Sequence, residues 1–272
     1  MWADKHAGHG IAFFKNSPSV LMRASKHFGG KKDPYALTLF GTTIYVITDP
    51  KHVAEVHKNT ESLTFEEFVI AILEQSGMSK AGIQTVYKPL PKDKPGFPNP
   101  NGDSMSTLVH SINVHQGYPG GNLFDLDGLF VKWFDHQFRF PSIVDTCAHY
   151  SMKTSSETCS IQVPLWQFCS EIQVQVAGDV YFGETLGQVE PDYVQTFLEF
   201  DDLCWQILYQ YPSFMTTKLT TAMKKMQSAL ERYIRIPQSK RNSVFQIKTE
   251  EDELRRIGVS EHDMAILFFN IF

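Results

Sequence analysis

The sequence predicts a mostly helical chain with a small β-hairpin near its N-terminus, an α+β fold. Its 272 residues are 42% hydrophobic and 20% charged, which is the composition of a globular protein with a sizeable core. Apolar residues recur at helical spacing along most of the chain. Residues 35–40 and 43–48 are instead β-rich, and the Gly41-Thr42 pair between them is typical of a hairpin turn.

Local start and stop signals define the N-terminal helices. The first helix is predicted over residues 12–28, where Pro18 suits a first helical turn and Gly29-Gly30 end the segment. Asp49-Pro50 then ends the second strand and opens a helix over residues 51–59.

The middle of the chain alternates amphipathic helices with a proline-rich loop. Residues 63–75 form the clearest such helix, and its apolar face carries Phe65, Phe68, Val69, Ile72 and Leu73. Five prolines within residues 87–102 predict a loop. Further helices are predicted over residues 104–114, 122–138, 143–153, 165–182, 192–209 and 217–236.

The C-terminal segment has the most unusual pattern. Residues 240–253 are expected to form a charged surface, and Ser260 is expected to cap a last helix over residues 261–272. That helix is apolar on all sides, which is typical of the middle of a large core, so we expect part of the core to be missing. The alternative is a terminal helix that docks on the chain's own core.

Charge and cysteine content restrict the function classes. The net charge of −5 disfavours nucleic-acid binding, which usually requires a basic surplus. The four cysteines form no CxxC pair or zinc pattern, and Cys169 and Cys204 are expected to be small buried apolar residues. No run of about 18 apolar residues predicts a membrane span, and no secretory signal is present. We therefore expect a reducing, cytosol-facing environment.

Motifs assign neither a catalytic residue nor a metal ligand. The sequence contains no HExxH, P-loop, GxGxxG or GxSxG motif. His110 and His115 are five residues apart, a spacing that does not place two side chains on one helix face for a metal. The run Glu250-Glu251-Asp252 is more typical of a solvated face than of paired catalytic carboxylates.

Six segments, taken in order, carry a resemblance to a known family: residues 8–17, 35–56, 116–126, 168–183, 200–212 and 259–272. Together they resemble the N-terminal half of a cytochrome P-450, a haem-thiolate monooxygenase, and within it fungal members related to sterol hydroxylases and prostacyclin synthase. Residues 1–272 would then be one partial cytochrome P-450 domain, with no complete second domain, that ends inside the family's long central helix.

The resemblance implies a haem cofactor, a small apolar substrate of lipid or sterol type, and a redox-partner reductase. The full-length family sits at the endoplasmic reticulum membrane through an anchor that is absent here. The family's haem-ligand loop, Phe-x-x-Gly-x-Arg-x-Cys-x-Gly, matches none of the four cysteines, and Glu253-Leu-Arg-Arg256 precedes the central helix where the family's Glu-x-x-Arg follows it. We therefore expect this chain to be inactive alone.

The resemblance also implies site residues. Phe65, Phe68 and Ile72 fall in the region that lines the family's substrate pocket, although ordinary core residues explain them equally well. His110 and His115 fall where the family contacts the haem propionates, since cationic donors suit carboxylates; the family uses Trp and Arg there. The alternative function is a non-catalytic helical binding or scaffold protein, in which a partner would have to cover the terminal residues Phe268, Phe269 and Phe272.

Overall fold

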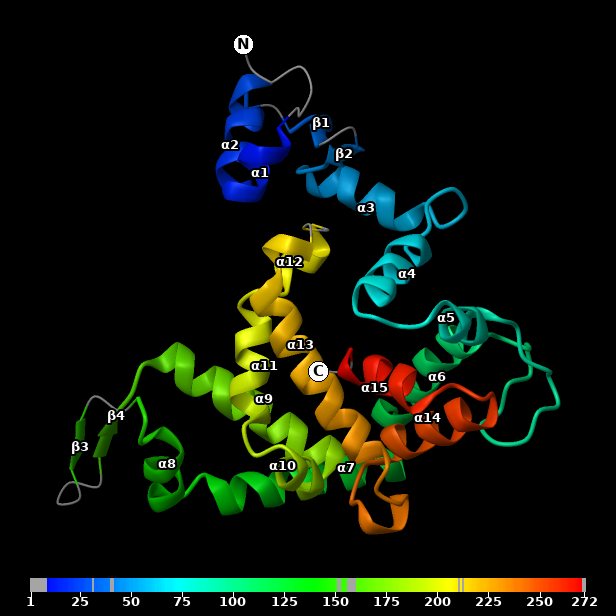
Figure 1. The fold of residues 1–272 in the computed structure, drawn as a ribbon, viewed down its shortest axis with the longest axis vertical. Helices are drawn as coiled ribbons and strands as arrows, with labels where there is room; N and C mark the ends of the chain where they lie inside the picture. The colour runs from blue at the N-terminus through cyan, green and yellow to red at the C-terminus, as the bar shows by residue number, and fades with distance from the viewer. Residues whose placement is uncertain are drawn as a thin grey trace. The chain divides into compact units, whose positions relative to one another are not determined.

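The computed structural model describes residues 9–30, 32–39, 42–150, 153–155, 160–209, 211 and 213–270. The chain divides into two compact units, Met1–Val69 and Ile70–Phe272, which are described separately below (Figure 1). Helices dominate the described residues, with a small antiparallel hairpin in each unit. The predicted fold class, mostly helical with a small N-terminal sheet, is confirmed.

The first unit packs two helices against the predicted hairpin. Helices α1 (Gly10–Lys15) and α2 (Ser17–His27) precede strands β1 (Tyr35–Leu39) and β2 (Thr42–Val46), which pair antiparallel. Helix α3 (Pro50–Lys58) follows. The buried core of this unit consists of Phe13, Val20, Ala24, Tyr35 and Leu37.

Asn16 divides the predicted helix over residues 12–28 into two. Its side-chain oxygen accepts a 3.0 Å hydrogen bond from the backbone N–H of Ser19 and so caps α2. Gly29 and Gly30 end α2 as predicted, because both have positive φ angles, of 76° and 66°, which glycine adopts without strain.

The boundary between the units falls within α4 (Glu66–Gln75), and the second unit is almost entirely helical. Its strands β3 (Lys153–Ser155) and β4 (Ser160–Gln162) form a short antiparallel pair that the sequence did not predict. Its helices are α5 (Lys80–Tyr87), α6 (Met105–Gly117), α7 (Gly121–Gln137), α8 (Phe140–Cys147), α9 (Leu165–Phe182), α10 (Glu184–Val189), α11 (Tyr193–Asp201), α12 (Trp205–Leu208), α13 (Thr217–Ile234), α14 (Phe245–Arg256) and α15 (Glu261–Phe269), with 3-10 turns at Ser213–Met215 and Gln238–Lys240.

The core of the second unit forms around α13, which contacts both α11 and α15 (Figure 1). The predicted helix over residues 217–236 is confirmed, and it ends at Ile234, three residues before Pro237. Its large apolar side chains are buried along one face: Met223, Met226, Leu230, Tyr233 and Ile234.

Several predicted helices differ in their bounds. The helix expected over residues 63–75 begins at Glu66. The helix expected over residues 143–153 is α8, which begins three residues earlier because Pro141 is accepted in its first turn, and which ends at Cys147, six residues before the predicted end. The helix expected over residues 192–209 is divided into α11 and α12 by a turn at residues 202–204. There the indole of Trp205 donates a 3.1 Å hydrogen bond to the carbonyl of Asp202, which satisfies a carbonyl group at the helix end.

Helix α15 begins as predicted, with the hydroxyl of Ser260 accepting a 3.1 Å hydrogen bond from the backbone N–H of Asp263. Asp263 is itself buried and also accepts hydrogen bonds of 2.8 Å from the backbone N–H and the hydroxyl of Ser79. Because the Ser79 hydroxyl caps α5 by accepting from the N–H of Gly82, this carboxylate joins the starts of two helices.

The apolar residues of α15 are covered by their own chain. Phe268 and Phe269 are buried, so the expectation that a partner must cover them is wrong, and the alternative of a docked helix describes them. Phe272 lies outside the described residues. The aromatic rings that cover the two phenylalanines belong to Phe182, Phe197 and Phe200.

Two further expectations are wrong. Cys169 is exposed rather than buried, because it lies on the solvent side of α9 next to the buried Ile172 face. Residues 240–253 are not a charged surface: Arg241, Glu250 and Glu251 are among the most buried side chains of the second unit. Arg241 and Glu251 are tolerated in the interior because they form an ion pair with each other there.

Candidate functional site

The residues predicted to line a substrate pocket lie on or beside α4. Phe65 precedes the helix and is 71% exposed, with its ring 5.1 Å from that of Phe68. Phe68 and Ile72 are half-buried and lie one helical turn apart on α4. The two α4 residues therefore share a helix face, and the exposed ring of Phe65 contacts Phe68 from just before the helix.

The two predicted propionate contacts, His110 and His115, are both exposed on α6. The ring of His115 lies 5.7 Å from that of Phe97 and 5.4 Å from that of Phe245, so it is the middle member of an aromatic cluster. The two histidines do not share one helix face, and this is the arrangement that their five-residue spacing predicts.

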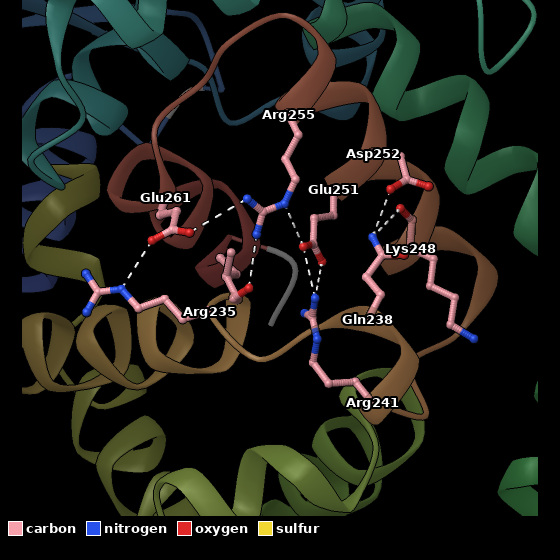
Figure 2. Close-up of polar contacts among 9 residues, drawn as sticks. Arg235, Gln238, Arg241, Lys248, Glu251, Asp252, Arg255 and Glu261 are labelled. Atoms are coloured by element: carbon pink, nitrogen blue, oxygen red, sulfur yellow. Dashed lines mark hydrogen bonds and ion pairs between the residues drawn. The ribbon is translucent and has the colours of Figure 1, made fainter.

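The structure instead gathers charged groups around α14, where the sequence predicted surface. Glu251 is almost fully buried and accepts two hydrogen bonds from Arg241, of 2.9 and 2.8 Å, through the same nitrogen, Nη2 (Figure 2). Arg255 donates a third, of 2.9 Å, from Nε. Two guanidinium groups thus neutralise one buried carboxylate.

This ion pair continues toward the neighbouring helices. Arg255 also donates a 3.0 Å hydrogen bond to the carbonyl of Ile234, at the end of α13. Its Nη1 lies 3.7 Å from Glu261 of α15, and Glu261 in turn pairs with Arg235 at 3.1 Å (Figure 2). The network therefore ties the adjoining ends of α13, α14 and α15 together.

Arg241 is 2% exposed and only partly satisfied. Its guanidinium carbon lies 4.6 Å from the ring centroid of Tyr233, a cation–π contact. Among the described residues, its Nε and Nη1 atoms and the hydroxyl of Ser243 are buried polar atoms with no hydrogen-bond partner. The positive charge of Arg241 is thus stabilised by the carboxylate of Glu251 and by the ring of Tyr233.

Glu253 forms a second buried ion pair, which fixes the proline-rich loop. Lys94 donates a 2.7 Å hydrogen bond to its carboxylate, the backbone N–H of Phe97 donates another of 2.6 Å, and Arg256 pairs with it from the next turn. Burial by itself would raise the pKa of Glu253, but the bonds from Lys94, Phe97 and Arg256 hold it below its ordinary value. The fit is close: a side chain at Gly96 would overlap Arg256 and Glu253.

Glu250 differs from its two neighbours because amides, not cations, surround it. Burial raises the pKa of its carboxyl group to about 7, and the hydrogen bond from Gln246 only partly opposes this. With its amide oriented so that the NH₂ group faces α14, Asn113 of α6 donates a 2.8 Å hydrogen bond to Oε1. A carboxyl group of this kind titrates near neutral pH, a property that functional sites often use.

A signal in the sequence could have located these residues. Ile247 and Leu254 are seven residues apart and both are buried. Glu250 and Glu251 lie three and four residues after Ile247, which is the spacing of one helix face. A helix pattern anchored on Ile247 and Leu254 predicts both carboxylates on the buried side.

The structure describes three of the four cysteines, and Cys159 lies outside the described residues. Cys147 is buried, and its sulfur accepts a 3.1 Å hydrogen bond from the hydroxyl of Tyr150. Cys169 is exposed and Cys204 is half-buried. Across the described ranges, no group of three or more His, Cys, Asp or Glu side chains could hold a metal ion.

Comparisons of the sequence with protein-family models and with curated proteins give no match. Within the described part of the chain, no helix combines the length and apolar character needed to cross a membrane.

Proposed function

We propose that this chain is the substrate-side half of a haem-thiolate monooxygenase of the cytochrome P-450 family, and that it does not carry out the oxidation by itself. The observation that supports this is the order of the elements. A hairpin is followed by α3, then by the long α9 with Gly183 at its end, and then by α11 to α15. These elements include the segments of the sequence that carry the resemblance.

The haem, once bound through a cysteine thiolate, would supply the oxygen chemistry. The cysteines of this chain do not fit that role, because none of them lies in the loop sequence that the family uses for the iron, and the buried sulfur of Cys147 accepts a hydrogen bond from Tyr150. In this proposal the role of the chain is to bind and orient an apolar, lipid- or sterol-like substrate. Interaction with a redox-partner reductase and association with the endoplasmic reticulum membrane are proposed for the full-length protein.

The first test concerns the gene. In the proposal, the coding sequence beyond the codon for Phe272 encodes the Phe-x-x-Gly-x-Arg-x-Cys-x-Gly loop and a Glu-x-x-Arg motif. A locus that lacks both would contradict membership of the family.

The second test uses the purified chain. It is mixed with haem, reduced and exposed to carbon monoxide, and no Soret band of a thiolate–carbon monoxide complex is expected. Appearance of that band would contradict the proposal that this chain does not ligate the iron.

The third test concerns the substrate. A fluorescent fatty-acid or sterol analogue is titrated against the chain, and Phe68→Ala is expected to weaken binding by about tenfold, as loss of one apolar contact area implies. The matched control is Phe124→Ala on α7, whose side chain is 77% exposed and lies away from α4 in sequence; it should bind like the parent chain. Equal affinity of both variants would remove Phe68 from the substrate contacts.

One observation favours a second function, that of a non-catalytic helical binding module. Phe268 and Phe269 of α15 are buried by the chain itself, so these two residues need no partner to cover them. A monodisperse monomer with a cooperative thermal transition and no affinity for haem supports this function. Aggregation or a gradual transition contradicts it.

A further inference from the structure

Glu250 lies in the contact between α6 and α14 and is 3% exposed. Its carboxyl group meets Gln246 of its own helix and Asn113 of α6. A second amide of α6, that of buried Gln116, accepts a 3.1 Å hydrogen bond from the backbone N–H of Gln246. The contact between the two helices thus places two amide groups beside the carboxyl group, while the third amide binds the backbone of α14.

The charged groups of the elements packed around α14 are engaged elsewhere. The loop before α6 contributes Lys94, which pairs with Glu253, and the turn before α14 contributes Arg241, which pairs with Glu251. Beyond the turn at the end of α14, Glu261 pairs with arginines.

The remaining titratable groups are likewise directed away. On α15, His262 lies near Glu231 and Asp263 binds serines. On α6, His110 and His115 are exposed. On α14 itself, Asp252 accepts from Gln238. In the described part of the chain, no cation forms an ion pair with Glu250, so nothing balances its charge when it ionises.

We propose that the contact between α6 and α14 is proton-dependent: it closes around a protonated Glu250 and opens locally when that carboxyl group loses its proton. A buried carboxylate without a cation is costly, whereas the neutral acid both accepts a hydrogen bond from an amide NH₂ and donates its own O–H. The ionised form gains water only if α6 moves away, because α14 is fixed on its other sides by Glu251 and Glu253.

The raised pKa of Glu250 sets the range in which this happens. Its ionisation in the closed contact is centred near neutral pH, while in the open contact the group is ionised from about pH 4.5 upward. Proton release on opening then makes the opening equilibrium of α6 rise by about tenfold between pH 6 and pH 8.

The test is hydrogen exchange of the backbone amides of α6 at pH 6, 7 and 8, with each rate divided by the intrinsic rate at that pH. In the parent chain, the corrected exchange of residues 105–117 is expected to increase about tenfold across this range. In Glu250→Gln it is expected to stay constant, since the amide cannot ionise. Asp252→Asn removes an exposed carboxylate of the same helix and should behave like the parent.

A pH-independent parent chain, or a Glu250→Gln variant that keeps the pH dependence, overturns the proposal. A second measurement holds even if that variant does not fold. The carbon-13 chemical shift of the Glu250 side-chain carboxyl in the parent chain is followed against pH. A midpoint between pH 6 and pH 8 supports the proposal, and a midpoint below pH 5 overturns it.

Discussion

Lys94 and Glu253, 159 residues apart in the sequence, form a 2.7 Å ion pair in which both side chains are almost fully buried. Lys94 also donates a 2.8 Å hydrogen bond to the carbonyl of Phe97, whose N–H binds the same glutamate. The position of the proline-rich loop on α14 therefore depends on two buried charges.

Replacing the lysine tests this dependence. Lys94→Met keeps most of the length of the side chain but leaves Glu253 with only Arg256 and one backbone N–H. We expect a loss of about 3 kcal/mol in the free energy of unfolding, the lower end for a broken buried ion pair, because those partners remain. Urea denaturation measures it. Lys88→Met, at an exposed position of the same loop, is the control and should change stability little; equal stability of both variants would contradict a structural role for the pair.

The partner of Arg241 gives a second prediction. Glu251→Gln leaves two guanidinium groups without a buried counter-charge, and we expect the free energy of unfolding to fall by about 3–5 kcal/mol. The next residue provides the control: Asp252→Asn keeps an oxygen for the 3.0 Å hydrogen bond from Gln238 at an exposed site and should cost no more than about 0.5 kcal/mol. A Glu251→Gln variant as stable as Asp252→Asn would show that the arginines find other partners.

Two helical glycines predict opposite effects of the same change. A Cβ atom at Gly178 of α9 would lie 2.6 Å from the ring of Tyr193, which is buried and donates a hydrogen bond to the carbonyl of Gln175. Gly178→Ala is expected to cost about 1–3 kcal/mol through overpacking. Nothing lies within 4 Å of the corresponding position at Gly128 of α7, so Gly128→Ala should stabilise the chain by up to about 1 kcal/mol. Thermal melting of both variants checks the pair, and a shift of the same sign in both would contradict it.

The titration of Glu250 makes global stability depend on pH. Its folded-state pKa of about 7 is above the ordinary glutamate value of 4.5, so the folded state binds the proton more tightly than the unfolded state. The corresponding stabilisation is complete below about pH 4.5 and is lost as the pH rises through 7, by roughly 3 kcal/mol in total. The difference in unfolding free energy between the parent chain and Glu250→Gln, measured from pH 4.5 to 8.5, isolates this contribution. A constant difference would contradict it.

Helix periodicity predicted the long elements because their apolar residues lie on one side and their ends carry clear signals. Residues 165–182 were predicted with the observed bounds, since Gly183 follows them with a φ of 73° that continues no helix. Asn16 was missed as a break because its side-chain cap needs only one hydrogen bond, to Ser19, and leaves the apolar pattern unchanged.

The charged layer of α14 was missed for a different reason. The many charged residues in 240–253 favour an exposed segment. Only the apolar residues Ile247 and Leu254 indicate that the helix face between them is buried. That Lys94 and Arg241 reach these carboxylates is a consequence of the tertiary fold, which local spacing does not contain. The roles of Phe65, Phe68, Ile72, His110 and His115 remain predictions, since they depend on a ligand.

The buried glutamates of α14 also affect how the chain folds. Their partners lie in three separate segments, at Lys94, Asn113 and Arg241, so α14 can be buried only after contacts distant in sequence have formed. Such contacts slow folding. Until those contacts form, the charged side chains of the segment surround its few apolar residues and oppose association with other chains. The residues that stabilise the folded interior therefore also protect the unfolded segment from aggregation.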